Sequence, residues 1–160
     1  MRAACSNAPV IRLVDTHDVP EVVRLVTETL GEFGLEFGKG AATDDDLPLL
    51  PASYSDRGGA FWVAYDGDAL VGTAGVFPVA PATFELRKMY LRPAARGLGF
   101  GRQLLDVAIA WTREHGATHM VLDTMEKMER AIAFYEAHGF VRDDTQRRGA
   151  RCSRGYIRTL

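Results

Sequence analysis

The sequence has only two cysteines, Cys5 and Cys152, and they lie near opposite ends of the chain with no Cys-x-x-Cys pair. We therefore expect two reduced thiols and neither a disulfide framework nor a structural zinc site. No apolar run approaches the 18 residues that a membrane-spanning helix requires, so no membrane partner is expected. The first residues also lack the apolar core of a signal peptide, which favours a cytoplasmic protein.

Positive charge is not in surplus, because 19 lysines and arginines face 21 acidic residues and leave a net charge of −2. This balance argues against a general nucleic-acid-binding protein. The arginines between Arg142 and Arg158 are interpreted as a solvated face, with nucleic-acid contact as the alternative. His115, His119 and His138 do not have the spacing of metal ligands on one helix, and no metal is expected.

The chain does have an ordinary globular composition, with 160 residues that are 47% hydrophobic and 25% charged. We predict a single domain over residues 10–160, after a disordered lead-in over residues 1–9. Hydrophobic periodicity predicts a strand and a helix, then three consecutive antiparallel strands with a hairpin turn at Asp66-Gly67-Asp68, and then further helices and strands. The expected strands cover 10–14, 61–65, 69–77, 84–91, 119–124, a short segment from Phe140, and 155–160; the expected helices end near Leu30, His115 and His138. This order predicts an α/β layer architecture in which strand 119–124 runs parallel to strand 84–91.

Residues 31–60 differ from the rest because glycines and prolines interrupt every regular pattern. A short helix is plausible where the acidic run from Thr43 to Leu47 begins, since acidic side chains favour a helix N-terminus. A long irregular stretch inside a small domain is often a binding loop or lid. Disorder is the alternative that the pattern leaves open.

A glycine-rich loop, Arg96-Gly97-Leu98-Gly99-Phe100-Gly101, follows the strand that stops at Pro93 and opens the next helix. Glycines there expose backbone N–H groups at the positive end of a helix, which favours an anion such as phosphate. The loop lacks the Gly-Lys pair of a Walker A motif. It also fails the dinucleotide fingerprint, because Arg102 stands where the third glycine is required.

The loop resembles the pyrophosphate-binding segment of the GNAT superfamily of N-acetyltransferases. A second motif, from Ala131 through Tyr135 to Gly139-Phe140, matches the same superfamily's A-x-x-x-Y-x-x-x-G-F signature. The resemblance covers most of the chain and is strongest from Glu85 to Phe140. It implies a mixed, mostly antiparallel sheet of six to seven strands, flanked by helices and splayed between the fourth and fifth strands.

The resemblance implies acetyl-CoA as cosubstrate, with no metal, and direct transfer to an amine in a ternary complex. The acceptor would be a small molecule or a peptide, and a homodimer is possible. Main-chain atoms of the splayed strand would pair with the pantetheine arm, and the glycine loop would bind the pyrophosphate with two arginines adding positive charge. The residues concerned are Met89, Tyr90 and Leu91 for pantetheine, and Arg96, Gly97, Leu98, Gly99, Phe100, Gly101 and Arg102 for pyrophosphate.

Two side chains are the candidate catalytic groups. Tyr135 matches the family's general-acid tyrosine, and a phenol suits a departing thiolate because the two have similar ordinary pKa values. Packing in the core is its alternative role. Glu85 is the first candidate for the general base, acting through water, and Asp123 is the alternative. Glu85 could equally be a strand residue that pairs with Arg87 or Lys88.

The sequence also bears on the acceptor and on alternatives to the assigned chemistry. Near Met128 the family often has an asparagine that contacts the cofactor. Met128 has no hydrogen-bonding amide, which puts that contact in question here. The acids Glu32, Glu36 and Asp44–Asp46 favour an amine or otherwise cationic acceptor by charge complementarity. A different acyl-CoA is an alternative donor. A non-catalytic acyl-CoA-binding or regulatory module of the same fold is the alternative function.

Overall fold

The structure, a computed structural model, describes residues 9–160. Residues 1–8, with Cys5 and most of the predicted lead-in, lie outside the described part. Within it, seven strands form one sheet in the order β1-β2-β3-β4-β5-β7-β6. The strands are β1 (Val10–Leu13), β2 (Ala60–Asp66), β3 (Ala69–Ala80), β4 (Thr83–Leu91), β5 (His119–Thr124), β6 (Val141–Arg142) and β7 (Arg154–Thr159).

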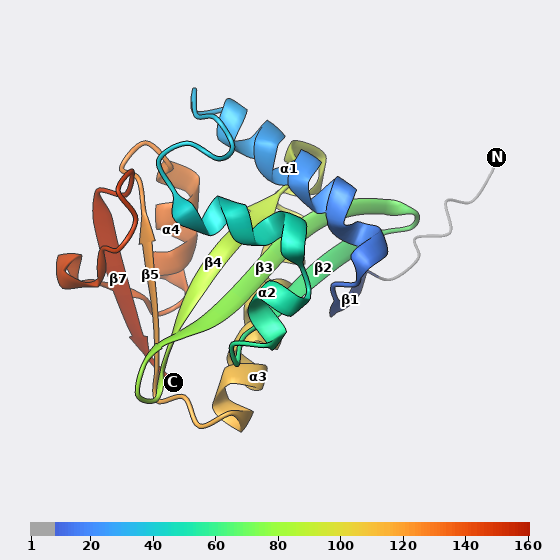
Figure 1. Ribbon diagram of the computed structural model, residues 1–160. Helices are drawn as coiled ribbons and strands as arrows, with labels where there is room; N and C mark the ends of the chain where they lie inside the picture. The colour runs from blue at the N-terminus through green and yellow to red at the C-terminus, as the bar shows by residue number, and fades with distance from the viewer. Residues whose placement is uncertain (1–8) are drawn as a thin grey trace.

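Every pair of neighbouring strands in this part of the chain is antiparallel except β4 and β5, which run parallel. The connection between those two strands is a helix, as a parallel pair requires. The mixed, mostly antiparallel sheet predicted from the sequence is confirmed. The chain direction and strand order can be followed in Figure 1.

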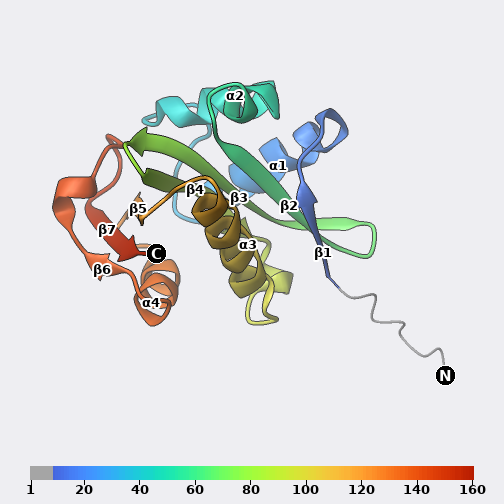
Figure 2. The ribbon, with the colours of Figure 1, turned by 90° about the horizontal axis from the view of Figure 1, so that it is seen from below.

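Helices cover both faces of the sheet (Figures 1 and 2). On one face lie α1 (Val19–Gly31) and α2 (Ala52–Ser55), and on the other lie α3 (Phe100–Glu114) and α4 (Glu129–Ala137). Short 3-10 helices complete the described chain: η1 (Thr16–Asp18), η2 (Ala42–Leu49), η3 (Pro93–Ala95) and η4 (Asp144–Gln146). No helix in residues 9–160 is both long enough and apolar enough to cross a membrane.

The two faces of the sheet carry separate hydrophobic clusters because successive side chains of a strand point to opposite sides. On β2, Trp62 and Ala64 pack with α3 and α4, whereas Phe61 and Val63 pack with α1, η2 and α2. The amphipathic α3 contributes Leu104 and other buried side chains to the first cluster. Full burial of such side chains contributes about 1.5–3 kcal/mol each.

The parallel strands β4 and β5 are paired over only a short part of their length. Their register covers Thr83–Glu85 against His119–Val121, and within the described residues they do not pair beyond it. A bulge follows in β4, where the pairing with β3 shifts and Lys88 adopts a φ of 52°. The Thr73 hydroxyl donates a hydrogen bond of 2.7 Å to the Lys88 carbonyl. The predicted splay between the fourth and fifth strands is therefore confirmed.

The irregular segment 31–59 has defined structure. The short helix expected near Thr43 is present as part of η2, and α2 follows it. The sequence did not indicate α2, because four residues between prolines and glycines are too few to show a helical period. Disorder, the alternative interpretation of this segment, does not describe it.

Candidate active site

A cavity of about 1180 Å³ lies where β4 and β5 diverge. Its walls come from β4 between Glu85 and Leu91, from β5 between Leu122 and Thr124, and from α4. We call the part near Leu91, Gly97 and Gly101 the glycine end. We call the part formed by residues 38, 40–43 and 45, Glu85–Lys88 and 148–152 the arginine end.

The glycine loop has the backbone conformation that its sequence predicts. Gly97 and Gly99 have φ values of +77° and +90°, a region that side chains with a Cβ rarely adopt. A Cβ built on Gly97 would meet nothing within 4 Å. The N–H groups of Gly97, Leu98 and Gly99 donate no hydrogen bond to any of residues 9–160. Free donors and open space at the start of α3 make this loop suitable for an anion.

The structure places some of the predicted loop and strand residues on the cavity and leaves others beside it. Leu98 is an exposed side chain, Phe100 is buried in the core, and Arg102 is exposed near Asp106. These side chains do not line the cavity, so any role there falls to backbone atoms or, for Arg102, to charge at the rim. The predicted residues that line it are Met89, Tyr90, Leu91, Arg96, Gly97 and Gly101.

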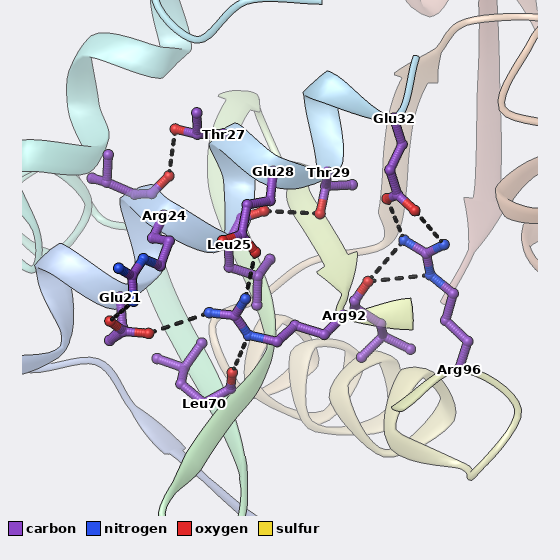
Figure 3. A network of polar contacts seen from close by, with 12 residues as sticks. Glu21, Arg24, Leu25, Thr27, Glu28, Thr29, Glu32, Leu70, Arg92 and Arg96 are labelled. Atoms are coloured by element: carbon purple, nitrogen blue, oxygen red, sulfur yellow. Dashed lines mark hydrogen bonds and ion pairs between the residues drawn. The ribbon is translucent and has the colours of Figure 1, made fainter. Parts of the chain in front are cut away.

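Arg96 has its charge balanced by α1 (Figure 3). Its guanidinium donates to both carboxylate oxygens of Glu32, at 3.0 and 2.6 Å, and to the Leu91 carbonyl at 3.0–3.2 Å. The neighbouring Arg92 bonds Glu28 at 2.5 Å and Glu21 at 3.2 Å. Arg96 therefore fastens the glycine loop to α1, and it is not the uncompensated positive charge that the sequence suggested.

Tyr135 projects from α4 and lines the cavity, with 8% of its surface exposed. Its ring packs edge-on against Phe134 and Phe140. Its hydroxyl makes no hydrogen bond within the described residues. Burial raises the pKa of Tyr135 above the ordinary value of 10.0, and the nearby Tyr90 adds to the shift. The phenol therefore stays protonated and can donate a proton into the cavity.

Glu85 lines the arginine end and is only 5% exposed. Its Oε1 accepts a hydrogen bond of 2.5 Å from Arg87 Nε, so Arg87 is the pairing partner and Lys88 is not. Its Oε2 is buried and has no hydrogen-bond partner in the described chain, although Arg148 Nη1 lies 3.7 Å away. One oxygen of this carboxylate therefore lacks a hydrogen-bond donor.

Asp123, the alternative base, holds a loop. Its Oδ2 accepts hydrogen bonds from the backbone N–H groups of Arg148 and Gly149, at 2.6 and 2.7 Å. It thereby positions the wall from which the Arg148 side chain extends. At Met128, where the family often has asparagine, the thioether accepts a 3.5 Å hydrogen bond from the Thr124 hydroxyl.

A buried ion cluster at the arginine end was not predicted. Asp44 is fully buried, forms a hydrogen-bonded ion pair with Lys88, and accepts bonds of 3.2 Å from Arg151 and 2.9 Å from the Gly38 N–H. Burial alone would raise the pKa of Asp44, but the bonds and charge of Lys88, with the Gly38 bond, hold it below its ordinary value. No local pattern joins residues that lie 44 and 107 positions apart.

The acids that favoured a cationic acceptor are mostly used within the protein. Glu32 pairs with Arg96, Glu36 pairs with Lys39 at 2.5 Å, and Asp44 belongs to the buried cluster. Within the described chain, Asp45 is the one of these acids that both lines the cavity and is exposed. Among residues 9–160 no three His, Cys, Asp or Glu side chains are grouped so as to hold a metal ion.

Comparison with known proteins agrees with this geometry. Residues 25–140 match the acetyltransferase (GNAT) family. The uncharacterized N-acetyltransferase YjgM of Escherichia coli K12 is 35% identical over 145 residues, which cover 88% of this chain and 86% of the relative. A GNAT-family acetyltransferase from Staphylococcus aureus Mu50 superposes with a TM-score of 0.84 at 26% identity, over 96% of this chain and 99% of that one.

The chain therefore belongs to the acetyltransferase (GNAT) family, and the prediction of an N-acetyltransferase is confirmed at that level. The fold is also shared with yncA of Salmonella typhimurium, a putative acetyltransferase that was solved with its cofactor acetyl-CoA. That protein has a TM-score of 0.72 and 21% identity, over 96% of this chain and 94% of its own.

Proposed function

We propose that this chain transfers an acetyl group from acetyl-CoA to the amine of a small-molecule or peptide acceptor, with both substrates bound in one cavity. The observation that carries the proposal is the continuity of that cavity. It joins a loop of free backbone donors, a protonated Tyr135 and a buried carboxylate oxygen on Glu85. Its volume of about 1180 Å³ exceeds the usual range for a single small ligand, which is roughly 300–1,000 Å³.

The glycine end fits the phosphate-bearing part of acetyl-CoA. The N–H groups of residues 97–102 would bind the pyrophosphate, since those of Gly97, Leu98 and Gly99 have no partner in the described chain. Main-chain atoms of Met89–Leu91 would pair with the pantetheine arm, because β4 has no neighbour on the β5 side beyond Glu85. When bound, acetyl-CoA would supply the acetyl group as an activated thioester.

The remaining residues would move protons and stabilise charge. Glu85 would accept the proton of the acceptor's ammonium through a water molecule, at its free Oε2. Tyr135 would give its hydroxyl proton to the departing sulfur as the C–N bond forms and the C–S bond breaks. A backbone N–H of the splayed strand would polarise the carbonyl. Asp123 is less suited to the role of base, because two backbone N–H groups already occupy its Oδ2.

Binding and transfer can be tested separately on the purified full chain. We expect acetyl-CoA at 100 times its Kd to raise the free energy of unfolding by about 2.7 kcal/mol. This gain would be detected as a higher melting temperature. We also expect CoA release and an acetylated product when pooled amines are added. Gly97→Glu should abolish the stabilisation, because it places a carboxylate where the pyrophosphate would lie.

Gly67→Glu is the matched control, since Gly67 also has a positive φ and open space at its Cβ position but lies in the β2–β3 hairpin. If acetyl-CoA fails to stabilise the wild-type chain, the donor assignment is wrong. If it binds and no acceptor is acetylated, the chain is a binding module instead. A cytoplasmic location and a homodimer are still predictions, which fractionation of cells and light scattering would test.

A further inference from the structure

We infer that the acceptor is a zwitterion whose amine and carboxylate are carried on the same carbon, that is, a free α-amino acid. The inference rests on the proposed function and narrows its acceptor. It departs from the cationic acceptor that the acidic residues suggested. Its basis is the pair formed by Glu85 and Arg148 at the arginine end of the cavity.

Glu85 offers a place for the ammonium group. Its Oε2 is buried and has no hydrogen-bond partner in the described chain, and the residue lines the cavity. An unpaired carboxylate oxygen in a buried position is costly, and a charged N–H donor from a ligand would remove that cost. The other oxygen is already bonded to Arg87, which holds the carboxylate in a fixed orientation.

Arg148 offers a place for the carboxylate. Its side chain is 36% exposed, and its guanidinium bonds only to the carbonyl and side chain of Gln146 among residues 9–160. It therefore retains N–H donors for a planar, two-point bond to a carboxylate. The loop that carries it is held in place by the Asp123 bonds to the backbone of Arg148 and Gly149.

The other cations of the cavity's arginine end are already occupied. Arg87 is bonded to Glu85 and lies over the Phe77 ring at 4.2 Å. Lys88 and Arg151 share the buried Asp44, and Arg151 also bonds the Lys39 carbonyl. Among the described cations that line this end, Arg148 is thus the most exposed, at 36%, and its carboxylate partner is the farthest away, at 3.7 Å.

The charges of this end also favour a ligand with an anionic group. The described cations lining it are Arg87, Lys88, Arg148 and Arg151, and the carboxylates lining it are Glu85, Asp45 and the adjoining Asp123, while Asp44 is buried behind Lys88. The lining therefore has one more positive than negative charge. Asp45 lies at the exposed rim, where solvent and salt screen it. A purely cationic acceptor would add to the excess, whereas a zwitterion would not.

The spacing of the two protein groups favours an amine and a carboxylate on one carbon. Arg148 Nη1 and Glu85 Oε2 are 3.7 Å apart, so groups that bind both must lie side by side. The ammonium and carboxylate of an α-amino acid are adjacent in this way. Binding would replace one long ion pair with two short, hydrogen-bonded ones. It would also place the amine in direct contact with Glu85 Oε2, so that in this complex the proton would pass to Glu85 without the bridging water.

The test compares acceptors that differ only in the carboxylate. Pools of free amino acids, their amides and their decarboxylated amines are assayed for CoA release and, by mass spectrometry, for acetylated product. We expect kcat/KM for the best amino acid to exceed that for its amide or amine by at least about tenfold. The amide and the amine lack the carboxylate, so their charge-assisted hydrogen bonds with Arg148 are lost. Equal or faster turnover of the amine or the amide would overturn the inference while leaving the acetyltransferase activity in place.

Variants of the loop supply a second, independent readout. Arg148→Ala should lower kcat/KM about 10–100-fold for the amino acid and leave that for the matched amine within about twofold. Arg148→Lys should recover part of the loss. Arg147→Ala is the matched control, because Arg147 precedes it in the same loop but does not line the cavity. An equal loss for amino acid and amine would contradict carboxylate binding. An unchanged melting-temperature shift with acetyl-CoA would show that the donor site is intact in each variant.

Discussion

The two ends of the cavity are built in different ways. At the glycine end the contacts available to a ligand are backbone N–H groups from one continuous stretch, set by the positive φ of Gly97 and Gly99. At the arginine end they are the charged side chains of Glu85 and Arg148, which come from separate segments and lie beside the buried cluster of Asp44, Lys88 and Arg151. A backbone site depends on local conformation, whereas a side-chain site depends on the whole fold. The following predictions test this contrast, from the largest expected effect to the smallest.

Removing Asp44 should have the largest effect on stability. Asp44→Ala leaves Lys88 buried without its partner, which typically costs 3–5 kcal/mol. Chemical denaturation would measure the loss. Asp45→Ala, one residue along and exposed, should change stability by less than about 0.5 kcal/mol. The double variant Asp44→Leu/Lys88→Met should recover much of the loss, and a double variant as unstable as Asp44→Ala would show that the charge pair is not the cause.

Tyr135→Phe tests a cavity residue that belongs to neither end. We expect kcat to fall about 10²–10³-fold while acetyl-CoA binding is retained, since only the proton donor is lost. Because the pKa of Tyr135 is raised, the acid form persists at higher pH than for an ordinary tyrosine. Wild-type kcat should therefore show no decline from Tyr135 below about pH 10. Steady-state kinetics over pH 6–10 would check both points, and unchanged turnover in the variant would exclude this residue as the acid.

Asp18, remote from both ends, provides a reference for a buried charge that needs no ligand. Burial opposes its ionisation, but hydrogen bonds from Arg12, the Asp15 backbone and Tyr65 lower its pKa to about 2 from 3.8. Because the folded pKa is lowered, its stabilisation of about 2 kcal/mol is present above pH 4 and lost as pH falls toward 2. The stability difference between wild type and Asp18→Asn should shrink over that range in urea titrations. A constant difference would be inconsistent with this linkage.

Glu32→Gln should have the smallest effect. The Glu32–Arg96 pair is partly exposed, so its loss should cost about 1 kcal/mol or less. Freeing the Arg96 charge beside the glycine loop should tighten acetyl-CoA binding about twofold to fivefold, and more at low salt. Calorimetric titration at two salt concentrations would measure this. Weaker binding would mean that the Glu32–Arg96 ion pair holds the glycine loop in its binding conformation, in addition to neutralising the charge of Arg96.

Glu36→Gln is the matched control for that change, because Glu36 pairs with Lys39 on the surface. It should leave both stability and acetyl-CoA affinity unchanged within error. If both variants alter affinity alike, the effect is one of net charge and not of the freed arginine.

The sequence predicted the parts of the molecule whose signals are local. Asp66-Gly67-Asp68 marked the β2–β3 hairpin, and the glycine loop marked the start of α3. Tertiary pairing could not be found in this way, because Arg96 and Glu32 are 64 residues apart and Asp44 and Arg151 are 107 apart. Such pairs depend on how the helices and loops pack on the sheet. The sequence therefore indicated which residues would stand at the glycine end, and misjudged which acids at the other end were free.

Lys88 connects the two ends, because its backbone forms the bulge of β4 and its side chain reaches Asp44 in η2. This places a constraint on engineering the protein. Residues 38–45 look like a module that could be exchanged with another member of the family to change the acceptor. A graft that lacked an acid at position 44 would leave a buried lysine unpaired next to the strand that is proposed to hold the donor. A working exchange would therefore have to keep an acid at position 44 or change position 88 together with the loop.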